Sequence, residues 1–316
     1  MEIYKTQSTI AKKSNWLLSM VVTLLVTIGV LFLFQGLSLF LVVPLFELSL
    51  EDVLQVATGQ STNPNGRMAL LIIQGLGAGF AFIVATLVIA KLVDKADMGF
   101  KQHFANFKFI PFLIMIFVIF GGMLFNTLLI DLNGNFQFPS FLAEFEQMLQ
   151  QKEEELMRLT KYLTDFDSVQ ELLMGVLVIG IMAGLGEELF FRGLLQPKLH
   201  SYTGNMHLGV WLTAFIFSAI HMQFYGFLPR MLLGAIFGYL YCYSGSLIYP
   251  ILAHIFNNTF TVVLVYLGKL GKIDFNIDEV DEASWPVALG GLVLLVICLK
   301  LFSEKSKPNL THEKLE

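Results

Sequence analysis

Residues 16–46 read WLLSMVVTLLVTIGVLFLFQGLSLFLVVPLF and contain no charged side chain. A helix needs about 20 predominantly apolar residues to cross the hydrocarbon core of a bilayer. The run is far too long for the core of a signal peptide, and it lacks an evident small-residue cleavage site. We therefore expect a retained first membrane span over residues 16–40 or slightly beyond.

The rest of the chain repeats this pattern of long apolar runs separated by polar connections. Only 14% of the residues are charged and 55% are hydrophobic, whereas soluble domains usually carry about 25% charged residues. We expect an all-α fold, a polytopic transmembrane helical bundle of about eight spans, in a single integral membrane domain over residues 1–316. The further spans are expected at residues 68–93, 109–130, 169–195, 207–224, 227–243, 247–267 and 285–302.

The longest polar stretch covers residues 131–167. Its centre, 141–162, is rich in Glu, Gln, Leu and Met, which predicts an exposed amphipathic helix. It contains the acidic run Glu153-Glu154-Glu155. Charged runs on helices usually face water, so the run predicts a solvated helix face.

The lysines predict how the chain is oriented in a cell membrane. Basic residues near span ends mark the cytoplasmic side. They gather at both ends of the chain and in the loop after the second span, whereas the loop before the last span is acidic. An even number of spans then places both termini on the cytoplasmic side. The lysines at the two ends are Lys5, Lys12, Lys13, Lys300, Lys305, Lys307 and Lys314.

Several function classes find no support in the composition. There is no basic stripe and no basic–aromatic interleaving, so nucleic-acid binding is not expected. Cys242 and Cys298 both lie inside apolar runs. They are expected to behave as small hydrophobic residues rather than as a disulfide or a CxxC metal motif.

Ionisable side chains in the C-terminal spans are the candidates for chemistry. Such a group costs at least about 2.5–3.5 kcal/mol at the bilayer centre, so it usually has a purpose. The spacing of Glu188 and Arg192 is i,i+4, which predicts an ion pair and leaves Glu187 free to face another direction. The same spacing relates Phe217 to His221, and His254 to Asn258.

These residue types suit peptide hydrolysis. A carboxylate in an apolar setting, such as Glu187, can act as a general base on water. An imidazole can share that work, and a His–Asn pair can donate hydrogen bonds to an oxyanion. Glu and two His could instead hold a divalent metal such as zinc, although HExxH is absent. No serine or cysteine stands beside a plausible base.

The three motifs EExxxR, FxxxH and HxxxN, in this order on successive apolar segments, resemble the CAAX-processing and bacteriocin-processing (CPBP) family of membrane proteases. That family includes the type II CAAX prenyl endopeptidases, and the resemblance covers a protease core at about residues 170–268. It implies that Glu187 and His221 activate the hydrolytic water and that His254 and Asn258 stabilise the oxyanion. Glu188 and Arg192 would support the site, and His221 and His254 would be the ligands of any metal.

The resemblance implies an intramembrane endopeptidase acting on a membrane-anchored peptide or protein, either prenylated or bacteriocin-like. Metal dependence and the identity of the substrate stay open at this point. One alternative is a non-catalytic membrane adaptor or bacteriocin self-immunity protein that retains the site. Another is an ion-coupled transporter, since buried Glu and His also form proton relays, but no inverted repeat or pair of broken helices supports it.

Overall fold

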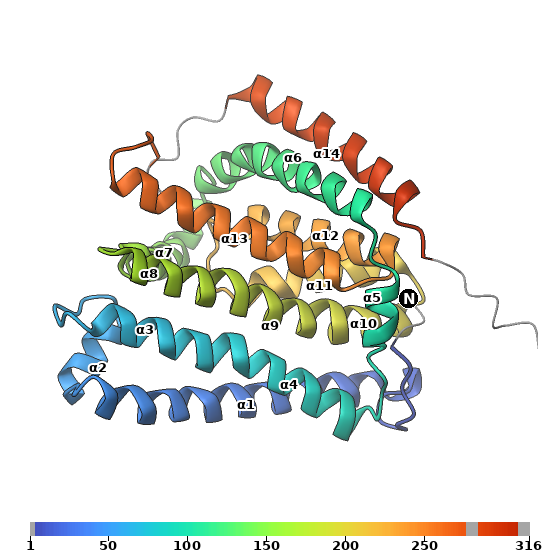
Figure 1. Cartoon of the computed structure of the whole chain (residues 1–316), viewed down its shortest axis with the longest axis horizontal. Coiled ribbons are helices and arrows are strands. Elements are labelled where there is room, and N and C mark those ends of the chain that lie inside the picture. Colours follow the sequence, from blue (N-terminus) through green and yellow to red (C-terminus); the bar gives the residue numbers. More distant parts are fainter. Residues whose placement is uncertain (1–3, 276–283, 309–316) are drawn as a thin grey trace, which may run out of the picture.

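The computed structural model describes residues 4–275 and 284–308. Long helices run side by side, so that the chain crosses repeatedly between two ends of one bundle (Figure 1). The expected all-α bundle of about eight spans is confirmed. The long elements are α1 (Trp16–Leu45), a composite helix over Gly66–Val93, α6 (Phe109–Gly134), a composite helix over Val169–Thr203, α11 (Met206–Ala219), α12 (Phe227–Ser244), α13 (Ile248–Lys269) and α14 (Trp285–Lys305).

Within the described residues, six of these helices are long and apolar enough to cross a membrane, and α11 is a shorter apolar helix. The packing of α1 shows why a bilayer suits them. This helix buries Ser19, Thr23 and Thr27 against the bundle and leaves large apolar side chains outside, with Phe32 77% and Phe40 81% exposed. Polar inside and apolar outside is the arrangement that a hydrocarbon solvent stabilises.

Short helices complete the connections. The helix α2 (Leu50–Ala57) begins with a capping box between Ser49 and Asp52, and α5 (Phe100–Ala105) lies at the N-terminal end of the bundle (Figure 1). The hydropathy pattern did not predict either, because six to eight residues are too few for a span. Gly204 and Gly245 end α10 (Gln196–Thr203) and α12 in the left-handed conformation, which favours glycine.

Two of the expected spans contain π-helical segments. The helix Gly66–Val93 comprises α3 (Gly66–Gln74), η2 (Gly75–Phe80), α4 (Ala81–Val88) and η3 (Ile89–Val93). The helix Val169–Thr203 comprises α8 (Val169–Gly175), η5 (Val176–Met182), α9 (Ala183–Phe190), η6 (Phe191–Leu195) and α10. π-Helical turns often occur at functional sites, and here two of them flank α9, which carries Glu187 and Glu188.

The fifth helix ends several residues earlier than expected. The helix was predicted to continue to residue 224, but α11 ends at Ala219. His221 therefore lies in a connection, residues 220–226, rather than on the helix. In this connection, which we call the His221 loop, Met222 has a positive φ of 56°. A non-glycine residue in that conformation stores about 1–3 kcal/mol of strain and stops a right-handed helix.

The predicted amphipathic helix is α7 (Ala143–Thr164), which follows the short η4 (Ser140–Leu142). It lies at the end of the bundle opposite the N-terminus (Figure 1). The prediction that the whole acidic run is solvated is wrong for Glu153. Glu154 and Glu155 are exposed, but Glu153 is half-buried and accepts hydrogen bonds from the His221 loop.

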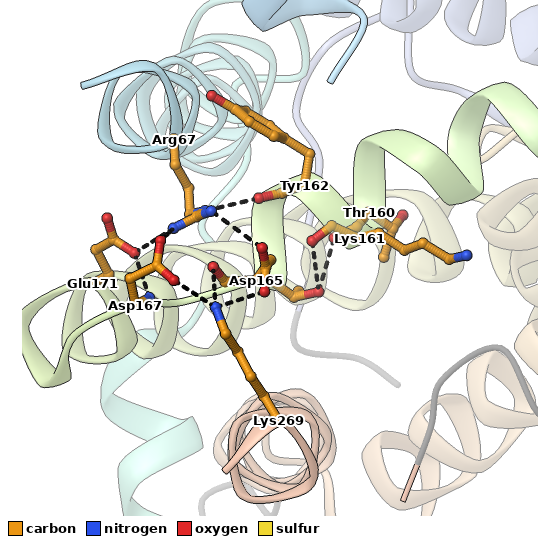
Figure 2. Close-up of polar contacts among 9 residues, drawn as sticks. Arg67, Thr160, Lys161, Tyr162, Asp165, Asp167, Glu171 and Lys269 are labelled. Carbon is orange, nitrogen blue, oxygen red and sulfur yellow. Dashed lines mark hydrogen bonds and ion pairs between the residues drawn. The ribbon is translucent and has the colours of Figure 1, made fainter. Parts of the chain in front are cut away.

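Charged groups just beyond α7 attach this helix to the bundle. Arg67 on α3 contacts Asp167 at 2.8 Å and Glu171 on α8 at 2.6 Å. Lys269 on α13 contacts Asp165 at 2.6 Å and Asp167 at 2.7 Å. Figure 2 shows how these side chains converge from three helices on the short segment between α7 and α8. We call this set the α7 anchor.

Candidate active site

The buried centre of the candidate site is Glu188. One of its carboxylate oxygens, Oε1, accepts a hydrogen bond from Arg192 Nη1 at 2.6 Å and another from His254 Nδ1 at 2.9 Å. Glu188 and Arg192 have no exposed surface, and His254 is 5% exposed. The first and third sequence motifs therefore meet at one carboxylate, and the predicted pair of Glu188 and Arg192 is present.

Arg192 also holds neighbouring helices together. Its Nη2 donates to the carbonyl oxygen of Gly234 on α12 at 2.7 Å. The guanidinium lies over the ring of Phe217 on α11, 4.9 Å from the ring centroid. A buried cation is tolerated only when it is paired and hydrogen-bonded. Here a carboxylate, a carbonyl and an aromatic face surround Arg192.

Phe217 connects the second motif to the other two. Besides the Arg192 guanidinium, its ring makes T-shaped contacts with His221 and His254, with centroids 5.2 Å and 5.9 Å apart. The imidazole of His254 stacks in addition on Phe237 at 4.9 Å. Aromatic surfaces thus fix the orientation of both imidazoles.

The hydrogen bonds indicate which nitrogen of each imidazole is free. His221 Nδ1 lies 2.8 Å from the carbonyl oxygen of Phe217. A carbonyl oxygen only accepts, so Nδ1 carries the hydrogen, and in the neutral ring Nε2 keeps its lone pair. By the same reasoning, His254 uses Nδ1 to donate to Glu188, and its Nε2 is not engaged by that bond.

Glu187 differs sharply from its neighbour Glu188. Glu187 is half-buried, and its Oε2 atom is buried without a hydrogen-bond partner, as is Oε2 of Glu188, whose bonds all go to Oε1. Within residues 4–275 and 284–308, no hydrogen bond or ion pair of its carboxylate is present. A carboxylate withdrawn from solvent and left unpaired normally calls for an explanation, and a catalytic role is one.

Asn258 lies one helical turn after His254 on α13. Its Nδ2 donates to the carbonyl of Ile179 in η5 at 2.9 Å, and its Oδ1 accepts from Asn257 at 3.2 Å. A side-chain amide has two N–H donors, so one donor is left for another partner. Asn258 thus ties α13 to a π-helical segment, which the sequence did not predict.

Arg230 and Gln223 are neighbours of the site that sequence reasoning missed. The charge of Arg230, on the first turn of α12, is close enough to interact with that of Glu187. Its Nη2 donates to Gln223 Oε1 at 2.8 Å. One signal was present in the sequence. With both termini predicted to be cytoplasmic, the sixth span begins on the opposite side of the membrane, where a basic residue such as Arg230 is not expected.

The placed residues do not complete a usual metal site. Among the residues that the structure describes, no group of three His, Cys, Asp or Glu side chains could hold a metal ion. Catalytic zinc normally has three protein ligands and one open position. His221 and His254 therefore stay a predicted pair of ligands without a third, and we derive no step through a metal.

Comparison with known proteins supports the interpretation of the three motifs. Residues 169–260 match the family described as type II CAAX prenyl endopeptidase Rce1-like. The chain is 34% identical over 100 residues to an "Uncharacterized 24.3 kDa protein" of Escherichia coli, covering 30% of this chain and 46% of the relative. It is 28% identical over 128 residues to the "Putative membrane peptidase YdiL" of Bacillus subtilis (strain 168), covering 40% of this chain and 50% of that protein.

The chain thus spans about half the length of the curated relatives that it matches. No solved structure matches it significantly. The matched residues contain all three motifs and the whole buried cluster around Glu188. The resemblance predicted from the motifs is confirmed for this segment: residues 169–260 are similar to the type II CAAX prenyl endopeptidase Rce1-like family of membrane proteases.

Proposed function

We propose that this protein is a membrane-embedded endopeptidase that hydrolyses a peptide bond of a membrane-associated substrate with water activated by Glu187. One observation carries the proposal. Of two adjacent carboxylates, Glu188 is fully buried and paired with Arg192 and His254, whereas Glu187 has no hydrogen-bond partner among the described residues. The first holds the site together and the second is free to bind water.

In the proposed reaction, the Glu187 carboxylate takes a proton from water while the water oxygen attacks the carbonyl carbon of the substrate. His221 shares this work through Nε2, since Nδ1 is bonded to Phe217. The resulting oxyanion collapses, the C–N bond breaks, and the proton passes to the leaving amine. A carboxylic acid and an amine are the products.

His254 and Asn258 would stabilise the oxyanion by donating hydrogen bonds to it. For His254 to donate through Nε2 it must be an imidazolium, because Nδ1 already donates to Glu188. Asn258 would donate through the Nδ2 hydrogen that Ile179 does not accept. Preorganised donors of this kind are a large source of catalysis.

The substrate would be a membrane-anchored peptide, since the site is built into apolar helices. Prenylated and bacteriocin-like substrates both satisfy this description.

The orientation of the site in the membrane follows from the predicted positions of the termini. With both termini cytoplasmic, as the lysines favour, the His221 loop and α7 would face the opposite side of the membrane, because they lie at the other end of the bundle from the N-terminus (Figure 1). Labelling single cysteines at residues 154 and 307 from either side tests this orientation.

The experiment is cleavage of a panel of membrane-anchored peptides, some prenylated, by the purified protein, with products identified by mass spectrometry. Wild type is compared with Glu187→Gln, each with and without a strong chelator. We expect the substitution to lower the rate by about 10²–10⁴-fold, the usual contribution of a general base. A folded Glu187→Gln protein that cleaves at the wild-type rate would contradict the proposal. Loss of wild-type activity in the presence of chelator would show that a bound metal ion, rather than Glu187 alone, activates the water.

A further inference from the structure

The His221 loop holds its shape although part of it is strained. Met222, next to His221, has φ 56°, a conformation that persists only where the surroundings enforce it. Backbone bonds tie down the start of the loop, from His221 to Ser218 at 3.2 Å and from Met222 to Ala219 at 3.1 Å, and its end, from Phe227 to Phe224 at 3.1 Å. None of these backbone bonds engages the N–H of Gln223 or Tyr225 in the middle of the loop.

Glu153 on α7 supplies two of these contacts. Its Oε1 accepts a hydrogen bond from the Gln223 side chain at 3.0 Å, and its Oε2 accepts one from the backbone N–H of Tyr225 at 3.2 Å. One carboxylate thus binds the loop at two points, on positions two and four residues after His221. Hydrogen bonds to an ionised acceptor are among the stronger ones in proteins.

The Gln223 amide extends this link toward Glu187. While its Nε2 donates to Glu153, its Oε1 accepts from Arg230 Nη2 at 2.8 Å. The charge of Arg230 interacts with those of both Glu153 and Glu187. Glu153 therefore orients an amide that in turn fixes a cation near the proposed base.

The helix that carries Glu153 is itself fixed in place. The α7 anchor binds its C-terminal end through Arg67 and Lys269 (Figure 2). Before α7, Phe136 and Phe138 pack on Phe224 of the His221 loop, with ring centroids 5.8 Å and 5.1 Å apart. The polar stretch between α6 and α8 thus contacts the loop twice, through the carboxylate of Glu153 and through the rings of Phe136 and Phe138.

We propose that Glu153 is a positioning residue of this active site, and that α7 serves to set the place of His221 through it. The inference rests on the proposed function, in which His221 shares the activation of water. It gives a role to the 131–167 segment, which lies outside the segment similar to the protease family. Glu153 acts through Gln223 and Tyr225 and is not a group that touches the reacting atoms.

Glu154 provides a matched control. It is an exposed glutamate on the same turn of α7, next in sequence to Glu153, and no hydrogen bond or ion pair to it is present among the described residues. Truncating either residue to alanine removes one negative charge and leaves a good helix former. A general effect of charge or helicity would therefore appear in both variants, and an effect of the loop contacts only in Glu153→Ala.

The first test is steady-state cleavage by the full-length protein. We expect Glu153→Ala to lower kcat by about 10- to 100-fold with KM unchanged, because a displacement of a catalytic group by about 1 Å costs up to 100-fold. Glu154→Ala should match wild type in kcat and Tm, so that a loss of kcat confined to Glu153→Ala comes from the loop contacts. Glu153→Gln, whose single oxygen can accept one of the two bonds, should lie between. A kcat equal in Glu153→Ala and Glu154→Ala would overturn the proposal.

The second test needs no turnover. Hydrogen–deuterium exchange of a peptide covering residues 220–227 reports the protection of the Tyr225 amide. We expect faster exchange there in Glu153→Ala than in wild type or Glu154→Ala, and unchanged exchange in the remaining helices. Equal exchange in all three proteins would overturn the proposal even if no substrate is found. Absence of wild-type cleavage with faster loop exchange would instead count against the proposed function alone.

Discussion

Two clusters of charged side chains hold this protein together in different ways. Around Glu188, the side chains of Glu188, Arg192 and His254 are 0%, 0% and 6% exposed. In the α7 anchor, the carboxylates of Asp165 and Asp167 are 57% and 69% exposed. The first cluster joins helices inside the bundle, and the second attaches a surface helix at one end.

The difference decides what each cluster can contribute. Removing one partner of a buried pair leaves an uncompensated charge at a cost of about 3–5 kcal/mol. An exposed pair usually contributes about 0.2–1 kcal/mol and is screened by salt. The buried cluster therefore fixes the geometry of the site, whereas the anchor can be weakened without unfolding the bundle.

The largest effect is expected for Arg192→Met, which leaves Glu188 buried without its cation. The substitution should lower the free energy of unfolding by about 3–5 kcal/mol, measured by denaturation of the detergent-solubilised protein. Adding Glu188→Gln should recover part of this loss, because the unpaired charge is then gone. Equal stability of wild type and Arg192→Met would show that the cluster is not structural.

A smaller effect is expected for Phe217→Leu, which removes the ring between Arg192 and the two histidines. Loss of the cation–π contact and of the edge contacts should cost about 1–2 kcal/mol and reduce cleavage. Phe215→Leu is the matched control on α11, since Phe215 is 53% exposed. If the two substitutions were equivalent in stability and in activity, Phe217 would be ordinary packing.

The smallest effect belongs to the exposed cluster. Hydrogen bonds from Arg67, and then from Lys269, lower the pKa of Asp167 to about 2. A lowered folded-state pKa gives stability that is present above the unfolded pKa of about 4 and is lost as pH falls toward 2. Asp167→Asn should thus cost less than about 1 kcal/mol at pH 7. The difference from wild type should shrink as pH falls through 2 and vanish below it, and a difference independent of pH would refute the ion pair.

Hydropathy predicted the spans well because the length of an apolar run reports directly on membrane crossing. It failed at the end of α11, because Ile220, Met222 and Phe224 continue the apolar run into the His221 loop. Nothing local signals the positive φ of Met222, since neither glycine nor asparagine stands there. The π-helical segments also escaped prediction, because they depend on how neighbouring helices fit.

The candidate site was predictable as far as helical spacing reaches. Spacing of i,i+4 found the pair of Glu188 and Arg192 and left Glu187 free, as the structure has it. It did not show that His254 pairs with Glu188, because that contact joins residues 66 positions apart. Nor could a run of three glutamates tell which one faces the His221 loop, since only the tertiary placement of α7 decides it.

The most direct test compares Glu187→Gln with Glu188→Gln, measuring both the cleavage rate and Tm for each purified variant. The two residues are adjacent and chemically identical, so only their surroundings differ. We predict that Glu187→Gln keeps the wild-type Tm and loses cleavage, whereas Glu188→Gln lowers Tm as well. Cleavage retained by Glu187→Gln, or the same loss of Tm in both variants, would contradict the assignment of the free carboxylate to catalysis and the paired one to structure.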